Sequence, residues 1–85
     1  MQEEMNLPIG TVVRINKEKQ LFMVSGYKVK QGNNIYDYCA SLFPEGILSF
    51  NDVYVFNKDK IEEVLFEGYK NEQYDKLSDL LNNSK

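Results

Sequence analysis

Residues that could do chemistry gather in one short stretch of this chain, from Tyr36 to Gly46. Asp37 lies between Tyr36 and Tyr38, where a carboxylate could act as a general acid or hold a polar group, and Cys39 offers a thiol. A thiol nucleophile needs a neighbouring base or cation, and the chain has no histidine to supply one. We therefore expect Cys39 to be a small structural strand residue. Asp37 is either an outward-facing residue on a half-exposed strand or a polar anchor in a tyrosine-rich recognition face; no partner is visible that would make it catalytic.

The rest of the sequence also offers few groups that could take part in catalysis. Without histidine the chain cannot form a Ser-His-Asp or Cys-His arrangement, and it has no Cys/His spacing typical of a zinc site. It also has no glycine-rich phosphate-binding loop. The adjacent acids Glu62 and Glu63 cannot share a proton by adjacency, because neighbours on a strand point to opposite faces. The sequence therefore predicts a protein that is not an enzyme and that holds no metal and no cofactor.

The elements that must position these side chains are short strands. Several runs are rich in β-branched and aromatic residues, a composition typical of strands in a small sheet. The predicted strands cover residues 11–15, 21–30, 35–43, 53–56 and 64–66. On the third strand, alternation places Tyr36, Tyr38, Ala40 and Leu42 on one face. The turn composition of residues 31–34 predicts a hairpin between the second and third strands.

Glycine, proline and asparagine mark where these elements bend and end. Gly26 lies inside the second strand and predicts a bulge or a sharp bend. Pro44 and Gly46 are the residues of a tight turn that ends the third strand. Asn57 is expected to cap a single helical turn over residues 58–61.

After Gly68 the hydrophobic period changes to that of a helix. Tyr74, Leu77 and Leu81 recur at intervals of three and four residues, which predicts an amphipathic helix with this face towards the fold. The C-terminal end of that helix is expected to fray.

The length of 85 residues is that of a single domain, 1–85. We expect a mobile polar lead-in over 1–6, a β-rich core over 7–68 and the C-terminal helix over 70–82. The predicted fold class is α+β, mainly β. It would be a small five-stranded bent sheet or an open SH3-like barrel, with the amphipathic helix covering an open mouth or an edge.

Charge and composition narrow the class of partner. The formal net charge of −3 argues against nucleic acid and against an anionic membrane, since both attract cationic surfaces. No apolar run approaches the roughly 18 residues of a membrane span, and residues 1–6 do not resemble a signal peptide. A single cysteine excludes an internal disulfide and fits a reducing compartment. A cytoplasmic location is therefore expected.

The sequence contains more aromatic residues than a core of this size needs. Six tyrosines and five phenylalanines are more rings than so small a core can bury, and aromatic side chains are enriched at protein interfaces. Some rings should therefore face a protein partner. Rings on an SH3-like barrel can also stack nucleic-acid bases, but the third strand carries no Arg or Lys to accompany them.

Several segments together resemble a small family of unknown-function domains in Gram-positive bacteria, whose members are often encoded beside LXG-domain toxins in type VII secretion loci. The resemblance covers about residues 7–70. It is carried by LPIGTVV at 7–13, MVSGY at 23–27, YDY at 36–38, LFPEGILS at 42–49, FN at 56–57 and FEGY at 66–69.

The resemblance implies a cytoplasmic chaperone or targeting factor that binds an LXG toxin before export, alone or with small helical targeting factors. It brings no catalytic residues. The positions on the matching motif are candidates for partner binding or for the fold: Tyr36, Asp37, Tyr38, Pro44, Glu45 and Gly46. For Pro44 and Gly46 a structural role in the turn is favoured. The alternatives are an immunity protein that neutralises a toxin domain, whose acidity would suit a basic nuclease, and an SH3-like nucleic-acid-binding domain.

Overall fold

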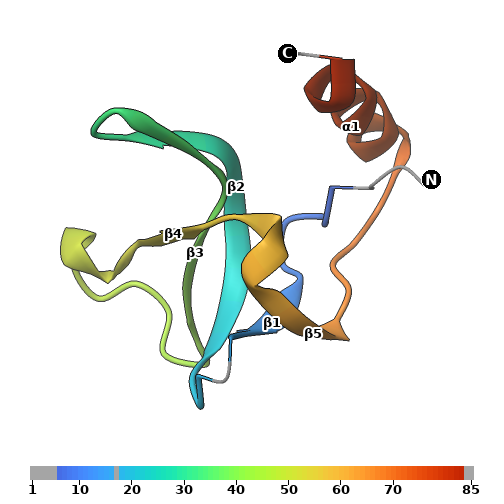
Figure 1. Cartoon of the computed structure of the whole chain (residues 1–85). Coiled ribbons are helices and arrows are strands. Elements are labelled where there is room, and N and C mark those ends of the chain that lie inside the picture. Colours follow the sequence, from blue (N-terminus) through green and yellow to red (C-terminus); the bar gives the residue numbers. More distant parts are fainter. Residues whose placement is uncertain (1–5, 17, 84–85) are drawn as a thin grey trace.

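The fold is one antiparallel sheet followed by a helix (Figure 1). The structure is a computed structural model that describes residues 6–16 and 18–83. The strands are β1 (Val12–Ile15), β2 (Leu21–Gln31), β3 (Asn34–Phe43), β4 (Tyr54–Phe56) and β5 (Ile61–Phe66). Two 3-10 turns, η1 (Phe50–Asp52) and η2 (Lys58–Lys60), flank β4, and α1 covers Glu72–Asn83. The sheet order is β4-β3-β2-β1-β5, which leaves the sheet open with β4 and β5 as its edges. The predicted mainly-β fold with one C-terminal helix is confirmed.

The predicted bend at Gly26 is confirmed as a bulge between β2 and β3. The register passes from Val24 opposite Ala40 to Gly26 opposite Cys39, so that Ser25 is the extra residue. A Cβ added at Gly26 would lie 2.7 Å from Sγ of Cys39, a distance that no real contact tolerates. Any side chain at position 26 would force the thiol of Cys39 to shift, so glycine is favoured where this thiol packs against the bulged strand.

The core lies inside the bend of the sheet. Val13 and Ile15 of β1, Phe22 and Val24 of β2, Tyr38 and Ala40 of β3, and Phe56 of β4 form one buried cluster. Strands β1, β2 and β3 each contribute alternate residues, as period-two patterning requires. The Tyr38 ring is only 1% exposed, and its centroid lies 5.8 Å from that of Phe56 and 5.9 Å from that of Tyr27.

Three tyrosine hydroxyls hold the segment that precedes β1. The Leu7 backbone N–H donates to the hydroxyl of Tyr38 (3.1 Å), while the hydroxyl of Tyr27 donates to the carbonyl of Leu7. The hydroxyl of Tyr74, on α1, donates to the carbonyl of Asn6. We call these three side chains the tyrosine clamp. The clamp supplies hydrogen-bond partners for backbone groups of this segment that are not paired within the sheet. A buried backbone N–H or C=O needs such a partner.

Helix α1 packs against this N-terminal segment (Figure 1). Tyr74 and Ser78 are its buried residues, and the side-chain amide of Asn6 donates to Ser78 Oγ (3.4 Å) and to Asn82 Oδ1 (3.1 Å). The expectation that Leu77 faces the fold is wrong, since Leu77 is 40% exposed. The helix turns a polar stripe spaced by four residues towards Asn6, and Leu77 lies beside that stripe.

The predicted lead-in needs a correction at one residue. Residues 1–5 lie outside the described residues, but Asn6 is buried between the clamp and α1. None of the helices in the described ranges is long and apolar enough to cross a membrane.

The tyrosine clamp predicts a loss of stability at alkaline pH. Burial of the hydroxyl raises the pKa of Tyr27 to about 12, with Tyr74 and Tyr38 adding to the shift. The folded protein therefore holds this proton more tightly than the unfolded chain, whose tyrosine titrates at 10.0. The stabilisation is complete below pH 10 and should be lost as the pH rises from 10 to about 12.

Urea unfolding below pH 10 and near pH 12 measures this loss. A Tyr27→Phe variant has no hydroxyl to ionise. It should be less stable than wild type at neutral pH, because the carbonyl of Leu7 loses its donor, yet it should lose less stability across the alkaline range. Equal losses in the two proteins would show that Tyr27 does not hold the segment in this way.

Candidate functional site

The motif at residues 36–46 does not form a single exposed surface. Tyr38 belongs to the core and cannot present its ring to a partner. Tyr36 and Asp37 are half-buried, and Pro44 and Glu45 are exposed. The tyrosines divide between the core and the surface: Tyr38 and Tyr74 are buried, whereas Tyr54 and Tyr69 are exposed.

Asp37 has a structural role that the sequence did not reveal. Its Oδ2 accepts a hydrogen bond from the backbone N–H of Lys58 (2.9 Å), the first residue of η2. Asn57, expected to cap this turn, makes no side-chain cap; its Oδ1 accepts from the backbone N–H of Asp37 (3.0 Å) instead. The carboxylate of a strand 21 residues away thus caps the turn, and the two side chains tie β3 to the β4–β5 connection.

Pro44, Glu45 and Gly46 form the predicted turn that ends β3. Gly46 has a φ of +77°, which favours glycine, and its N–H donates to the carbonyl of Leu42 (2.8 Å). The peptide bond before Pro44 is cis. These three residues end the strand directly after Phe43, a side chain that lines the cavity described next.

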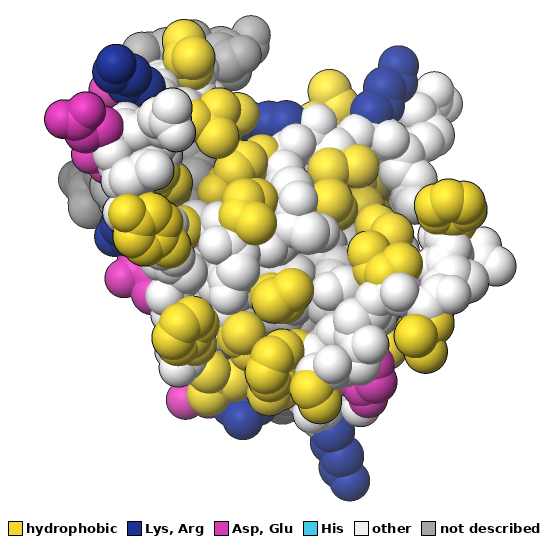
Figure 2. Space-filling view, turned by 180° about the vertical axis from the view of Figure 1, so that it is seen from behind, with side chains coloured by type: hydrophobic (Ala, Val, Ile, Leu, Met, Phe, Trp, Pro, Cys, Tyr) yellow, Lys and Arg dark blue, Asp and Glu magenta, His cyan; other side chains and the backbone are white. Residues whose placement is uncertain are grey.

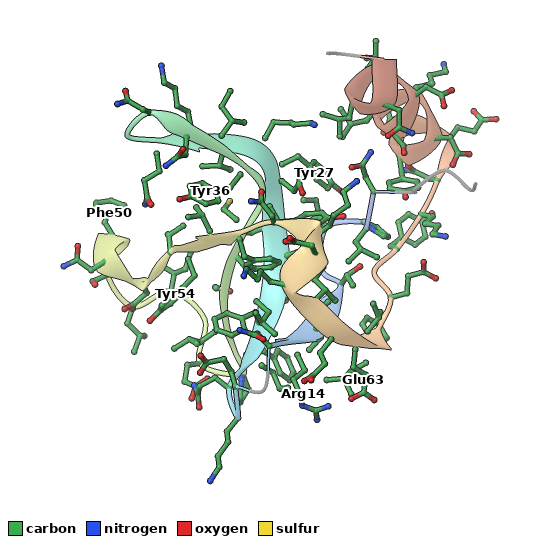
Figure 3. All side chains as sticks on the ribbon, in the orientation of Figure 1. Arg14, Tyr27, Tyr36, Phe50, Tyr54 and Glu63 are labelled. Atoms are coloured by element: carbon green, nitrogen blue, oxygen red, sulfur yellow. The ribbon has the colours of Figure 1, made fainter. Side chains whose placement is uncertain are left out.

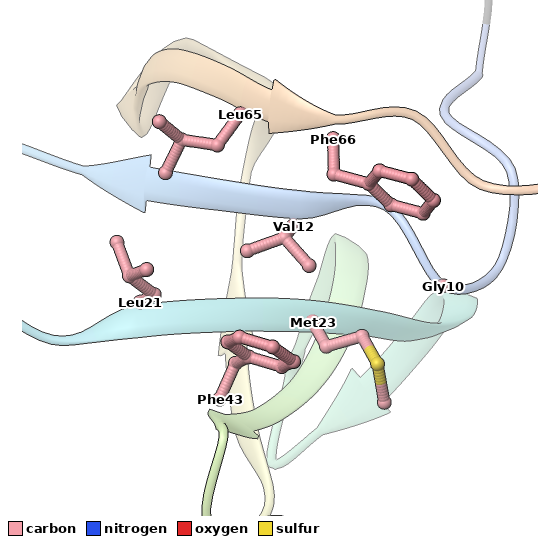
Figure 4. Close-up of a pocket in the computed structure, with 7 residues that line it drawn as sticks. All are labelled: Gly10, Val12, Leu21, Met23, Phe43, Leu65 and Phe66. Atoms are coloured by element: carbon pink, nitrogen blue, oxygen red, sulfur yellow. The ribbon is translucent and has the colours of Figure 1, made fainter.

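An apolar groove of about 490 Å³ lies across β1, β2 and β5 and the end of β3 (Figure 4). We call it the sheet groove. It is lined by Gly10, Val12, Leu21, Met23, Phe43, Leu65 and Phe66. Val12 lies on the face of β1 opposite to Val13, so the groove and the core occupy opposite faces of this part of the sheet. The groove is therefore a second apolar surface, on the outside of the molecule.

A bulge in β5 explains why two consecutive residues line the groove. Val12 pairs with Phe66 and Val13 pairs with Val64, so Leu65 is the extra residue on β5. In a regular strand Leu65 and Phe66 would face opposite sides, whereas a bulge re-aims its side chains. Both reach the groove, and Phe66 remains 63% exposed.

The sequence patterns discussed above do not predict this groove. The alternation of Leu21 and Met23 with the core residues Phe22 and Val24 was a usable signal, because it makes both faces of β2 apolar. A strand with two apolar faces needs cover on both. In the described structure nothing from α1 lines the groove, and Phe43 and Phe66 remain 42% and 63% exposed.

The groove offers no acid, base or nucleophile. All seven lining residues are apolar, and the next outward residue of β1, Arg14, is paired with Glu63 of β5. Within residues 6–16 and 18–83, no group of three or more His, Cys, Asp or Glu residues could hold a metal ion. Every buried side-chain nitrogen or oxygen in that part of the chain has a hydrogen-bond partner. The groove can therefore exclude water and bind apolar groups, but its lining provides no reacting atom.

Exposed apolar side chains are not confined to the groove. Figure 2 shows them gathered over one face of the molecule, with charged side chains mostly near its margins. Leu48, Phe50, Tyr69 and Leu80 are among the most exposed. Apolar patches of this kind mark interaction sites in soluble proteins.

Comparison with known proteins assigns the chain to a family. No curated protein and no solved structure matches it. A family model described as a domain of unknown function, DUF4176, matches residues 6–77, a range that contains all five strands and the first half of α1. The chain therefore belongs to the DUF4176 family of domains of unknown function.

Proposed function

We propose that this DUF4176 domain is a non-enzymatic cytoplasmic accessory protein that binds the helical export domain of an LXG toxin, as a chaperone or targeting factor for type VII secretion. The resemblance of its motifs at residues 7–13 and 36–49 to domains encoded beside LXG toxins supports the choice of partner. The sheet groove supports the mode of binding.

The single observation that carries the proposal is the wholly apolar lining of the groove. An amphipathic helix binds by laying its apolar face into such a groove. Met23 adds an adaptable side chain to the lining, and methionine-rich surfaces accommodate helices of differing sequence. A small-molecule site would need a few placed polar groups to orient its ligand, and this lining has none.

The electrostatics also favour an apolar contact. Arg14 and Glu63 neutralise each other beside the groove, and the chain as a whole carries a net charge of −3. Nucleic acid would need a cationic surface in this position. The proposed complex is held by burial of apolar area, with charge contributing little.

Isothermal titration of the purified LXG export domain against this protein, at low and at high salt, tests the proposal. We expect binding whose affinity changes little with salt, because salt screens exposed charge pairs and leaves apolar contacts intact. The separated toxic C-terminal domain is the control and should not bind.

Two outcomes would reject the chaperone proposal. No binding of the export domain at tens of micromolar would remove the partner altogether. Tight binding of the toxic domain instead would favour an immunity protein. A steep loss of affinity at high salt would contradict the apolar mode of binding.

A further inference from the structure

The connection between β3 and β4 presents apolar side chains that the residues described in the structure leave exposed. Phe50 is 97% exposed and Leu48 is 85% exposed, and Ile47 beside them is also exposed. Phe50 points away from the body of the molecule (Figure 3). Single exposed apolar residues are common, but a fully exposed ring next to two exposed aliphatic side chains forms a protruding apolar tip. We call residues 47–50 the tip.

Hydrogen bonds hold the backbone beneath this tip in one conformation. Oδ2 of Asp52 accepts from the backbone N–H groups of Leu48 (2.8 Å) and Ser49 (3.0 Å). Oγ of Ser49 accepts from the backbone N–H of Asn51 (3.2 Å), which completes a capping box around η1. The ring of Phe50 is therefore carried on an ordered turn. Binding through a pre-ordered element loses less conformational entropy than binding through a flexible loop.

The charges in the sequence around the tip indicate what kind of surface it can bind. Between Lys30 and Lys58 the sequence holds no Lys or Arg, and the turn region carries the acids Glu45 and Asp52. Membrane-surface segments combine apolar residues with Lys and Arg, because the cytoplasmic leaflet is anionic. The tip itself, residues 47–50, carries no charge and is flanked in the sequence by acids, so it fits a protein pocket with a neutral or basic rim.

We propose that the tip is an anchor that inserts the ring of Phe50 into an apolar pocket of a protein partner whose rim is neutral or basic. The inference rests on the proposed function for the identity of that partner, the LXG export domain. It adds a second contact, in which this domain supplies the protruding side chain, to the groove, where the partner supplies it. Aromatic side chains that fill a partner's pocket carry much of the binding energy of an interface.

Titration of the LXG export domain against three variants tests the anchor. Phe50→Ser should weaken binding at least about 30-fold and leave the melting temperature unchanged, because the ring is exposed in the free domain. Asp52→Ala keeps the ring but removes the acceptor that orders the turn, and it should weaken binding by a smaller factor, roughly 3- to 10-fold. Ile35→Ser, at an exposed position on the β2–β3 hairpin, is the matched control and should bind as wild type does.

The outcomes separate this inference from the proposed function. If wild type does not bind the export domain, both are rejected. If wild type binds, Phe50→Ser binds equally well and a groove substitution weakens binding, the anchor is wrong and the proposed function stands. Binding of wild type but not of Phe50→Ser to vesicles of anionic phospholipid, without an effect of Phe50→Ser on the toxin complex, would also overturn the anchor by assigning the tip to a membrane.

Discussion

Replacing Tyr38 with alanine is expected to lower the free energy of unfolding by about 3–5 kcal/mol, the range seen when a large buried aromatic is truncated. Tyr38 is only 1% exposed, and its ring packs against the rings of Tyr27 and Phe56, so truncation would leave a cavity in the core. A domain of 85 residues has a total stability of about 4–13 kcal/mol. The substitution should therefore remove a large share of the total stability. Urea denaturation followed by circular dichroism measures the change.

Tyr38→Phe is the control that isolates the hydroxyl. It keeps the ring but leaves the N–H of Leu7 without its acceptor, so we expect a smaller loss, of about 1–3 kcal/mol. A Tyr38→Ala protein as stable as wild type would contradict the placement of this residue in the core. A binding defect in Tyr38→Ala would carry no information about the interface, because the fold itself would be damaged.

The second large effect concerns the sheet groove. The double substitution Leu65→Gln with Phe66→Gln should weaken binding of the LXG export domain by about 100- to 1000-fold, since each apolar anchor at an interface contributes about 2 kcal/mol. Adjacent residues are not strictly additive, which gives the range its width. Because Leu65 is 42% and Phe66 63% exposed in the free domain, the melting temperature should fall only modestly, far less than the affinity. Titration calorimetry and thermal unfolding of the same preparations measure both quantities.

A matched double substitution separates the groove from general surface hydrophobicity. Leu77→Gln with Leu80→Gln removes two exposed apolar side chains from α1, away from the groove, and should leave affinity unchanged. Equal weakening by the two doubles would indicate that any loss of apolar surface matters. If the Leu65→Gln and Phe66→Gln double variant binds as tightly as wild type, the groove is not part of the interface.

Most of the elements could be predicted because their signals are local. The β-branched run at β1, the turn at Gly32 and Asn33 and the break at Pro44 each act through the backbone preferences of neighbouring residues. The bulge at Gly26 belongs to the same class, since a glycine inside a strand is itself the signal. These features depend on residues close together in the chain.

The faces of the elements could be predicted only in part. Alternation shows which residues of a strand lie on the same side, but the curvature of the whole sheet decides which side is enclosed. Tyr38 therefore became a core residue although it belonged to the candidate binding motif, and Phe66 became a groove residue through an unpredicted bulge. The helical period places Leu77 on the buried face of α1, because periodicity does not reveal that the helix packs against the polar side chain of Asn6.

Local sequence patterns are enough to predict the mainly-β class, the order of strands and helix along the chain, the turns and the excess of aromatic rings. How those rings divide between core and surface, and where the groove lies, depends on the tertiary fold. The tertiary fold also gives Asp37 its role, because the N–H that its carboxylate caps belongs to Lys58, which the fold brings beside β3. Local preferences act within a few residues, whereas burial and capping across the chain depend on contacts that exist only once the sheet has bent.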